Sequence, residues 1–304
     1  MAEEKTAALP QLTILSSPDW EDYELLDSGD GQKLERYGPY RFARPEPEAV
    51  WRRALPEKSW QNVDAVFRPS PEENGGHWET LKKLKPRWGM QYKGMHFWAQ
   101  VTASRHLGVF PEQASQWDWI REQVQNAKRP PAVLNLFGYT GLASLAAAQA
   151  GARVTHVDAS RKVVSWAHEN LQATGLDEDR VRWIVDDAVK FVQREGRRGT
   201  RYDGIILDPP KFGRGPKGEV WEFYKLLPDL LEACGQVLAA RPLFLVLTAY
   251  AVKASSITLS QAVSEMMASY GGTVTAGEVA LVENSAGRVL SLAIFARWAA
   301  GTQR

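Results

Sequence analysis

The most specific chemical signal in the sequence is Asp208-Pro209-Pro210-Lys211, which directly follows the apolar run Gly204–Leu207. Two consecutive prolines fix the backbone and end a strand, so that the preceding carboxylate and the backbone carbonyls project rigidly over a cleft. In methylation of a heteroatom, such a corner holds the substrate nitrogen in line with the methyl group, and this geometry supplies most of the rate. The alternative is a plain turn. We take Asp208, Pro209, Pro210 and Lys211 as candidate catalytic residues.

A second candidate site is the turn Asn135-Leu136-Phe137-Gly138-Tyr139-Thr140-Gly141, which joins an apolar strand directly to a helix. In a doubly wound sheet the free N–H groups of that helix face a ligand, and Gly141 allows close backbone approach. The turn lacks the G-x-G-x-x-G spacing used by the pyrophosphate of a dinucleotide. S-adenosylmethionine carries no phosphate and accepts bulkier residues here. The alternative is an ordinary turn that connects a strand to a helix and binds no ligand.

An acidic residue ends the next predicted strand. Asp158 lies 23 positions after Asn135, where a carboxylate can accept hydrogen bonds from both ribose hydroxyls. Because the strand before it is apolar, we favour ribose binding, with Ala159 and Ser160 beside the cofactor. The alternative is that this segment caps a helix.

Asp186 and Asp187 form a second acidic strand end. They suit the exocyclic amine of adenine, and Ala188 would line the ring. For Asp187, helix capping is an equally good interpretation.

Cations and aromatic residues alternate in the glycine-rich stretch after the two prolines. Such side chains can receive an extruded base, with stacking worth ~1–3 kcal/mol per base. We expect substrate contacts from Phe212, Arg214, Lys217 and, after the fifth strand, Tyr250. Alternatively, Tyr250 packs at the rim, and Trp221, Phe223 and Tyr224 start a helix and face the core.

The candidate residues follow different strands, so the fold must bring the ends of these strands together. From Ala132 onward, predicted strands alternate with predicted helices. We predict strands at 132–137, 153–158, 181–187, 202–208 and 242–250, helices at 142–150, 160–173, 221–238 and 259–270, and a hairpin of 274–283 with 289–298. This pattern predicts an α/β fold with a seven-stranded Rossmann-like methyltransferase sheet and a terminal antiparallel hairpin. A nicotinamide-binding domain normally ends with another parallel strand.

The N-terminal third is different, with short strand-like runs, turn signals and prolines. We predict a tail over residues 1 to about 18, within a small β-rich domain (1–85) that is a candidate for substrate recognition. The methyltransferase domain would then span 86–304.

Composition limits the function classes. The 304 residues are 44% hydrophobic with a net charge of +1, and neither a membrane span nor a secretory signal is visible, so we expect a soluble, cytoplasmic protein. The single cysteine, Cys234, excludes a disulfide framework, and the five scattered histidines predict no metal site. The low net charge does not require nucleic acid, and most basic clusters would be solvated faces.

In combination, these motifs resemble bacterial ribosomal RNA methyltransferases that modify large-subunit RNA at cytosine C5 or guanine N7. The matching text is VLNLFGYTG, GARVTHVDASRKVVSWAHENLQATGL, VDDAVKF and YDGIILDPPKFG, preceded by HLGVFPEQ at 106–113. The resemblance covers about residues 92–250. The N-terminal region does not look like the PUA-type RNA-binding domain common in the cytosine-modifying members.

The resemblance implies S-adenosylmethionine as cofactor and S-adenosylhomocysteine as product. It implies that Phe110 and Gln113 flank the cofactor, that Phe137, Tyr139, Thr140 and Gly141 hold its amino-acid end, and that Asp158, Asp187 and Asp208 meet the ribose, the adenine and the reacting end.

One departure from that family bears on the reaction. Methylation at pyrimidine C5 requires a thiolate that adds to the ring, and the cytosine-modifying members carry this cysteine just after the fifth strand. Here that region is Leu247–Ala251, and Cys234 lies in a predicted helix. We therefore predict methyl transfer to a nitrogen of an RNA base, with ribosomal RNA as the substrate class. A protein or small-molecule methyltransferase, or a nonenzymatic RNA-binding module with this fold, remains an alternative.

Overall fold

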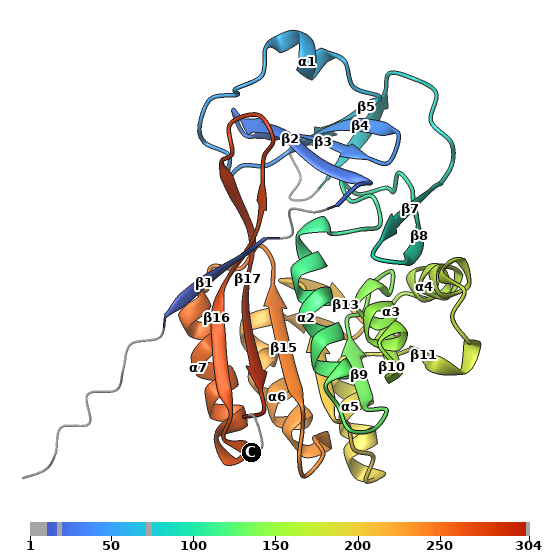
Figure 1. Ribbon diagram of the computed structural model, residues 1–304, viewed down its shortest axis with the longest axis vertical. Coiled ribbons are helices and arrows are strands. Elements are labelled where there is room, and N and C mark those ends of the chain that lie inside the picture. The colour runs from blue at the N-terminus through green and yellow to red at the C-terminus, as the bar shows by residue number, and fades with distance from the viewer. Residues whose placement is uncertain (1–10, 17–19, 71–74, 302–304) are drawn as a thin grey trace, which may run out of the picture.

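The computed structural model describes residues 11–16, 20–70 and 75–301. Its centre is a sheet in the order β1-β16-β17-β15-β12-β9-β10-β11 (Figure 1). Five of its strands are mutually parallel: β9 (Ala132–Leu136), β10 (Arg153–Asp158), β11 (Val181–Val185), β12 (Gly204–Leu207) and β15 (Phe244–Ala249). Most of their residues are buried because helices cover both faces, which explains their near-continuous apolar character.

The helices form two layers. On one face α2 (Ala114–Gln125) packs beside α3 (Leu142–Gln149) and α4 (Arg161–Thr174); on the other, α5 (Ala188–Arg197), α6 (Phe223–Val237) and α7 (Ser256–Met267) pack side by side. Neither α2 nor α5 was predicted from the sequence. Within the described residues, no helix combines the length and apolar composition needed to cross a bilayer.

The sheet ends in the predicted antiparallel hairpin. Strand β17 (Val289–Ala299) pairs with both β15 and β16 (Thr273–Val282), which confirms the seven-stranded arrangement. An eighth strand, β1 (Leu12–Ser16), adds in parallel to β16. The expected N-terminal tail is therefore wrong for this segment; residues 1–10 and 17–18 of it lie outside the described residues. Gly277 permits the pairing, because a Cβ there would collide with the Thr13 carbonyl.

The N-terminal region is β-rich, as predicted. Its five-stranded sheet comprises β2 (Tyr23–Gly29), β3 (Gln32–Tyr37), β4 (Tyr40–Pro45), β5 (Ala65–Pro69) and β6 (Gly76–Thr80), with the short helix α1 (Glu57–Gln61) before β5. The hairpin of β7 (Trp88–Tyr92) and β8 (Met95–Ala99) follows and packs on α4. Figure 1 shows the five-stranded sheet above the carboxyl ends of the parallel strands.

The tip of the C-terminal hairpin fastens this upper sheet. The Arg288 guanidinium donates to Asp27 Oδ1 at 3.0 Å and to the Ser28 carbonyl at 2.9 Å. The hydroxyl of Ser28 donates to Glu283, and the backbone N–H of Asn284 donates to the Leu25 carbonyl at 2.9 Å. The first and last parts of the chain thus hold one another over the strand ends.

Candidate functional site

The candidate site lies where the connections of the parallel sheet diverge. Strand β9 pairs with β10 on one side and β12 on the other, and ligands bind in the crevice outside such a switch point. Two adjoining hollows occur there: a cleft of about 1210 Å³ and a smaller pocket of about 50 Å³. They share Val109, Phe110, Phe137, Tyr139 and Asp208.

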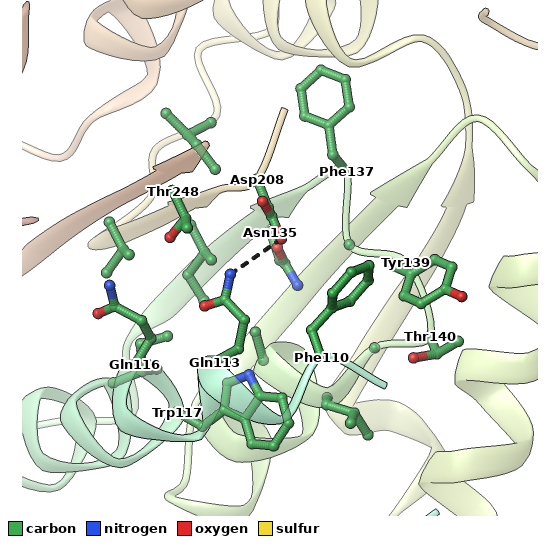
Figure 2. A pocket seen from close by; sticks show the side chains of 18 of the residues that line it. Phe110, Gln113, Gln116, Trp117, Asn135, Phe137, Tyr139, Thr140, Asp208 and Thr248 are labelled. Carbon is green, nitrogen blue, oxygen red and sulfur yellow. Dashed lines mark hydrogen bonds between the residues drawn. The ribbon is translucent and has the colours of Figure 1, made fainter. Parts of the chain in front are cut away.

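Most of the predicted site residues gather around these hollows. The smaller pocket, shown in Figure 2, is lined by Phe110, Gln113, Asn135, Phe137, Gly138, Tyr139, Thr140, Gly141 and Asp208. The cleft is lined by Asp158, Ala159, Ser160, Asp186, Asp187, Ala188, Asp208, Pro210, Lys211, Phe212, Arg214 and Tyr250. Pro209 is buried and Lys217 lies in an exposed loop; neither belongs to the lining.

The turn after β9 has a strained backbone. Phe137 (φ 57°) and Tyr139 (φ 49°) both adopt the left-handed conformation, which costs ~1–3 kcal/mol for a residue other than glycine. Gly141 also has positive φ (87°), and a Cβ there would lie 2.8 Å from that of Ala167. Packing on α4 therefore requires this glycine, in addition to any approach by a ligand. Strain of this kind persists where the surrounding structure enforces it, typically at ligand sites.

Polar contacts below the turn hold it in place. Asn135 Nδ2 donates to Ser144 Oγ at 2.8 Å, and Ser144 Oγ lies 3.0 Å from Nδ1 of His156. Burial lowers the pKa of His156 to about 3, so the ring is neutral. A Cβ at Gly138 would collide with this ring. The Asn135 amide is thus engaged by α3, and the hydroxyl of Thr140 likewise donates to the Gly108 carbonyl at 2.6 Å.

Asp158 is held by the backbone and retains acceptor capacity. Its Oδ2 accepts from the N–H of Tyr139 at 3.0 Å, and its Oδ1 from that of Ser160 at 2.9 Å. The N-cap of α4 is Ser160, whose hydroxyl accepts from the N–H of Val163. Since each carboxylate oxygen can accept more than one hydrogen bond, fixing this loop and receiving ribose hydroxyls are compatible roles.

Asp186 and Asp187, the second acidic pair, make different hydrogen bonds. Asp187 caps α5 by accepting from the N–H of Lys190 at 2.9 Å, so the alternative interpretation holds for one of its oxygens. Asp186 accepts from Arg194 at 2.6 Å. The other oxygen of Asp186 accepts from the N–H of Asp187 at 2.9 Å, so both oxygens of Asp186 are engaged, whereas Asp187 keeps one oxygen beyond its capping bond.

Asp208 stands at the junction of the two hollows. Burial, followed by repulsion from Glu112, raises the pKa of its carboxyl to about 8. Gln113 Nε2 donates to its Oδ2 at 3.4 Å, the contact dashed in Figure 2. A cation or hydrogen-bond donor that approaches this carboxyl would stabilise its ionised form and lower its pKa. Glu112, only 4% exposed, escaped sequence reasoning although it lies inside the quoted segment HLGVFPEQ.

Two hydrogen bonds from buried residues hold the diproline corner. Trp221 Nε1 donates to the Pro210 carbonyl at 2.6 Å, and the N–H of Phe223 donates to the Lys211 carbonyl at 3.0 Å. Both aromatic rings are buried, so the interpretation that they face the core is correct, whereas Tyr224 is exposed. The corner continues into a small ribbon of β13 (Phe212–Arg214) and β14 (Val220–Glu222).

The cleft is also lined by aromatic rings and by residues of the N-terminal sheet. The ring of Phe212 is 54% exposed. Tyr250 packs on Phe110 with centroids 5.2 Å apart, and its buried hydroxyl has no hydrogen-bond partner in the described structure. From the N-terminal sheet, Lys33 and Glu46 line the cleft as a 3.2 Å ion pair. No local motif marks this pair, because the position of the whole N-terminal sheet, and not the β3–β4 hairpin alone, brings it to the cleft.

Cys234 lies away from the cleft. It is fully buried in the α6 core, where burial raises the pKa of the thiol. A buried, protonated thiol is a poor nucleophile.

Comparison with known proteins gives consistent relationships. A family model described as S-adenosylmethionine-dependent methyltransferase matches residues 60–261. Ribosomal RNA large subunit methyltransferase K of Neisseria meningitidis is 27% identical over 229 residues, covering 70% of this chain and 61% of the relative. Ribosomal RNA large subunit methyltransferase I of Klebsiella pneumoniae is 31% identical over 120 residues, covering 39% and 29%. The matches thus span less than two thirds of either relative.

Solved structures extend the likeness to the whole chain. The SAM-dependent methyltransferase from Agrobacterium tumefaciens superposes with a TM-score of 0.91 at 47% identity, covering 98% of this chain and 97% of that one. SMU.776, a methyltransferase complexed with SAH, gives a TM-score of 0.69 at 19% identity, covering 91% and 75%. At that identity the second likeness concerns the fold alone.

Proposed function

Because the chain belongs to the S-adenosylmethionine-dependent methyltransferase family, we propose that it transfers a methyl group to a nitrogen of an RNA base, with ribosomal RNA as the substrate class. The names of the two relatives, both ribosomal RNA large subunit methyltransferases, support an RNA acceptor. An acceptor of this kind implies action in the cytoplasm.

The residues present fit the cofactor. Asp158 keeps lone pairs for the ribose hydroxyls, and Asp187 keeps an oxygen beyond its capping bond for the adenine amine. The strained turn 137–141 and Phe110 would hold the part of the cofactor nearer the sulfonium. Small-molecule pockets usually measure ~300–1,000 Å³; a cleft of about 1210 Å³ therefore leaves space for a second molecule.

Methyl transfer to nitrogen requires no covalent bond between the protein and the acceptor. When bound, S-adenosylmethionine supplies an electrophilic methyl group on a positively charged sulfur. Asp208, in its ionised form, accepts a hydrogen bond from an N–H of the acceptor and can take up the proton that this nitrogen releases. The diproline corner, held by Trp221, fixes the direction of that hydrogen bond, and orientation supplies most of the rate.

The observation that carries the proposal is that Asp208 lines one cleft together with two chemically different groups of residues. One group holds the cofactor candidates; the other holds the exposed ring of Phe212, Arg214 and the Lys33–Glu46 pair. A ring for stacking beside cations suits a nucleotide. We further assign acceptor recognition to the predicted N-terminal domain, residues 1–85, since its sheet supplies that ion pair.

Transfer to nitrogen is favoured over transfer to pyrimidine carbon C5. The latter needs a cysteine thiolate at the acceptor. The sole cysteine of the sequence, Cys234, is buried in α6. Attack by a nitrogen lone pair requires no covalent intermediate.

The test compares modified nucleosides in ribosomal RNA from cells with and without the gene. We expect one N-methylated nucleoside to disappear on deletion and to return with the wild-type gene but not with Asp208→Ala. If the RNA is unchanged while a protein or metabolite loses a methyl group, the acceptor assignment is wrong. If Asp208→Ala restores the nucleoside fully, the assigned role of Asp208 is wrong.

A further inference from the structure

Gln116 is a buried amide without partners. It lies on α2 three residues after Gln113, so both side chains share a helix face. Its residue is 1% exposed, and neither Nε2 nor Oε1 has a hydrogen-bond partner in the described structure. Leaving a buried donor or acceptor unpaired costs ~1–3 kcal/mol per group. Since buried polar groups are nearly always paired in native proteins, a group other than the described residues must satisfy this amide.

The position of Gln116 limits what that partner can be. Its side chain lines the smaller pocket together with Gln113, Thr248 and the turn 137–141. Figure 2 shows Gln116 and Gln113 on the α2 side of this pocket, below Asp208 and Thr248. The pocket meets the large cleft only along the five shared residues, which include Phe110 and Asp208.

This arrangement divides the cofactor between the two hollows. The ribose and adenine candidates, Asp158 and Asp187, line the cleft and not the smaller pocket. With the sulfonium beside Asp208 at the junction, the nucleoside extends into the cleft. The remaining part, the amino-acid end, then extends toward the smaller pocket.

The chemistry of an amide suits that end. A carboxamide has both N–H donors and a carbonyl acceptor, and the amino-acid end of the cofactor has both a carboxylate and an ammonium group. Of the two other side-chain amides that line the pocket, Asn135 already donates to Ser144 and Gln113 donates to Asp208. We propose that the Gln116 side chain binds the amino-acid end of S-adenosylmethionine, as an anchor on α2 additional to the turn after β9.

The experiment compares two neutral thioethers that differ only in the amino-acid end. S-adenosylhomocysteine has it, whereas 5′-methylthioadenosine carries a methyl group in its place. Both are titrated calorimetrically into wild type and into Gln116→Met, which preserves side-chain length and removes the amide. We expect S-adenosylhomocysteine to bind roughly 10- to 100-fold more weakly to the variant, the usual loss for a hydrogen bond to a charged group. Binding of 5′-methylthioadenosine should change by less than about twofold.

Two further variants keep the test decisive. Gln125→Met alters an exposed residue at the end of the same helix and should bind both ligands as wild type does. Gln116→Asn keeps an amide but withdraws it by one methylene, and should give a smaller loss confined to S-adenosylhomocysteine. If both Gln116 variants bind the two ligands as wild type does, the amide is satisfied by ordered water and the proposal fails. If they lose affinity for both ligands equally, the substitution acts on the pocket as a whole and the proposal fails as well. The readout is independent of the methyl acceptor, so an error in the proposed RNA substrate would not affect it.

Discussion

The indole Nε1 of Trp221 donates a 2.6 Å hydrogen bond to the carbonyl of Pro210, and this contact holds the diproline corner from its buried side. Trp221 is itself 3% exposed within the core between the sheet and α6. The direction in which Asp208 points is therefore set by a residue thirteen positions later in the chain.

Trp221→Phe should loosen the corner without unfolding the protein. Losing one hydrogen bond costs about 1 kcal/mol, which corresponds to roughly fivefold more frequent local opening. Trypsin should then cleave after Lys211 or Arg214 about fivefold faster. Trp298→Phe, on strand β17, removes a comparable indole hydrogen bond to the Gly271 carbonyl and should leave cleavage at these two sites at the wild-type rate. Equal acceleration in both variants would mean that general destabilisation, not the corner, was measured.

The raised pKa of Asp208 predicts pH-dependent discrimination between cofactor and product. With a pKa near 8, the carboxyl is largely protonated at pH 6.5 and ionised at pH 9. Only the ionised form attracts the sulfonium, which S-adenosylhomocysteine lacks. The ratio of the dissociation constant of the product to that of the cofactor should therefore rise as the pH increases through about 8, on the order of tenfold.

The control for this pH effect is Asp208→Asn, which has no charge to gain. The cofactor's own amino group also titrates in both proteins, so only the difference between wild type and variant reports on Asp208. A ratio with the same pH dependence in both would place the sulfonium away from this carboxyl.

Asp158→Asn should weaken S-adenosylhomocysteine and 5′-methylthioadenosine alike, by roughly 10- to 100-fold, because both ligands contain the ribose. This pattern differs from that expected for Gln116→Met. Calorimetric titration of the two ligands measures it. If 5′-methylthioadenosine binds normally, Asp158 serves only the Tyr139 and Ser160 N–H groups.

Arg214→Gln should weaken RNA binding mainly at low salt, because Arg214 is exposed on the cleft wall. For one lost phosphate contact, the slope of log affinity against log salt should fall in magnitude by about 1. Fluorescence anisotropy with ribosomal RNA fragments at several salt concentrations measures this slope. The matched control, Arg197→Gln, lies at the exposed far end of α5 and should keep the wild-type slope. Two identical slopes would remove Arg214 from the RNA-binding surface.

Arg288→Met should lower the free energy of unfolding by about 1.5–3 kcal/mol, since it removes a charged hydrogen bond to the fully buried Asp27. Chemical denaturation measures the loss. Arg52→Met breaks a solvent-exposed pair with Asp30, and surface pairs contribute ~1 kcal/mol or less. If the two variants are equally stable, the hairpin tip adds nothing beyond a surface contact.

Sequence reasoning succeeded where structure is set locally. The parallel strands are apolar throughout because helices cover both faces of the sheet. The corner after β12 is marked in the sequence by two consecutive prolines. Helix α2 was missed because its buried apolar stripe of Trp117, Ile120 and Val124 is short and is preceded by the buried but polar Gln116. That polar residue is the one whose unpaired amide is most informative.

Other features were beyond sequence reasoning because their causes are distant. Strand β1 exists only through pairing with β16, more than 260 positions away. The Lys33–Glu46 pair reaches the cleft only because the whole upper sheet is mounted there. Neither a periodicity nor a motif near these residues encodes that placement.

The contact between Asp27 and Arg288 spans 261 positions, and it has a consequence for how the protein is made. During translation the upper sheet emerges long before the partners that neutralise its buried carboxylate, Ser285 and Arg288. A nascent chain that stops before Glu283 lacks these partners, so this sheet is fastened over the cleft only after that later segment has been made.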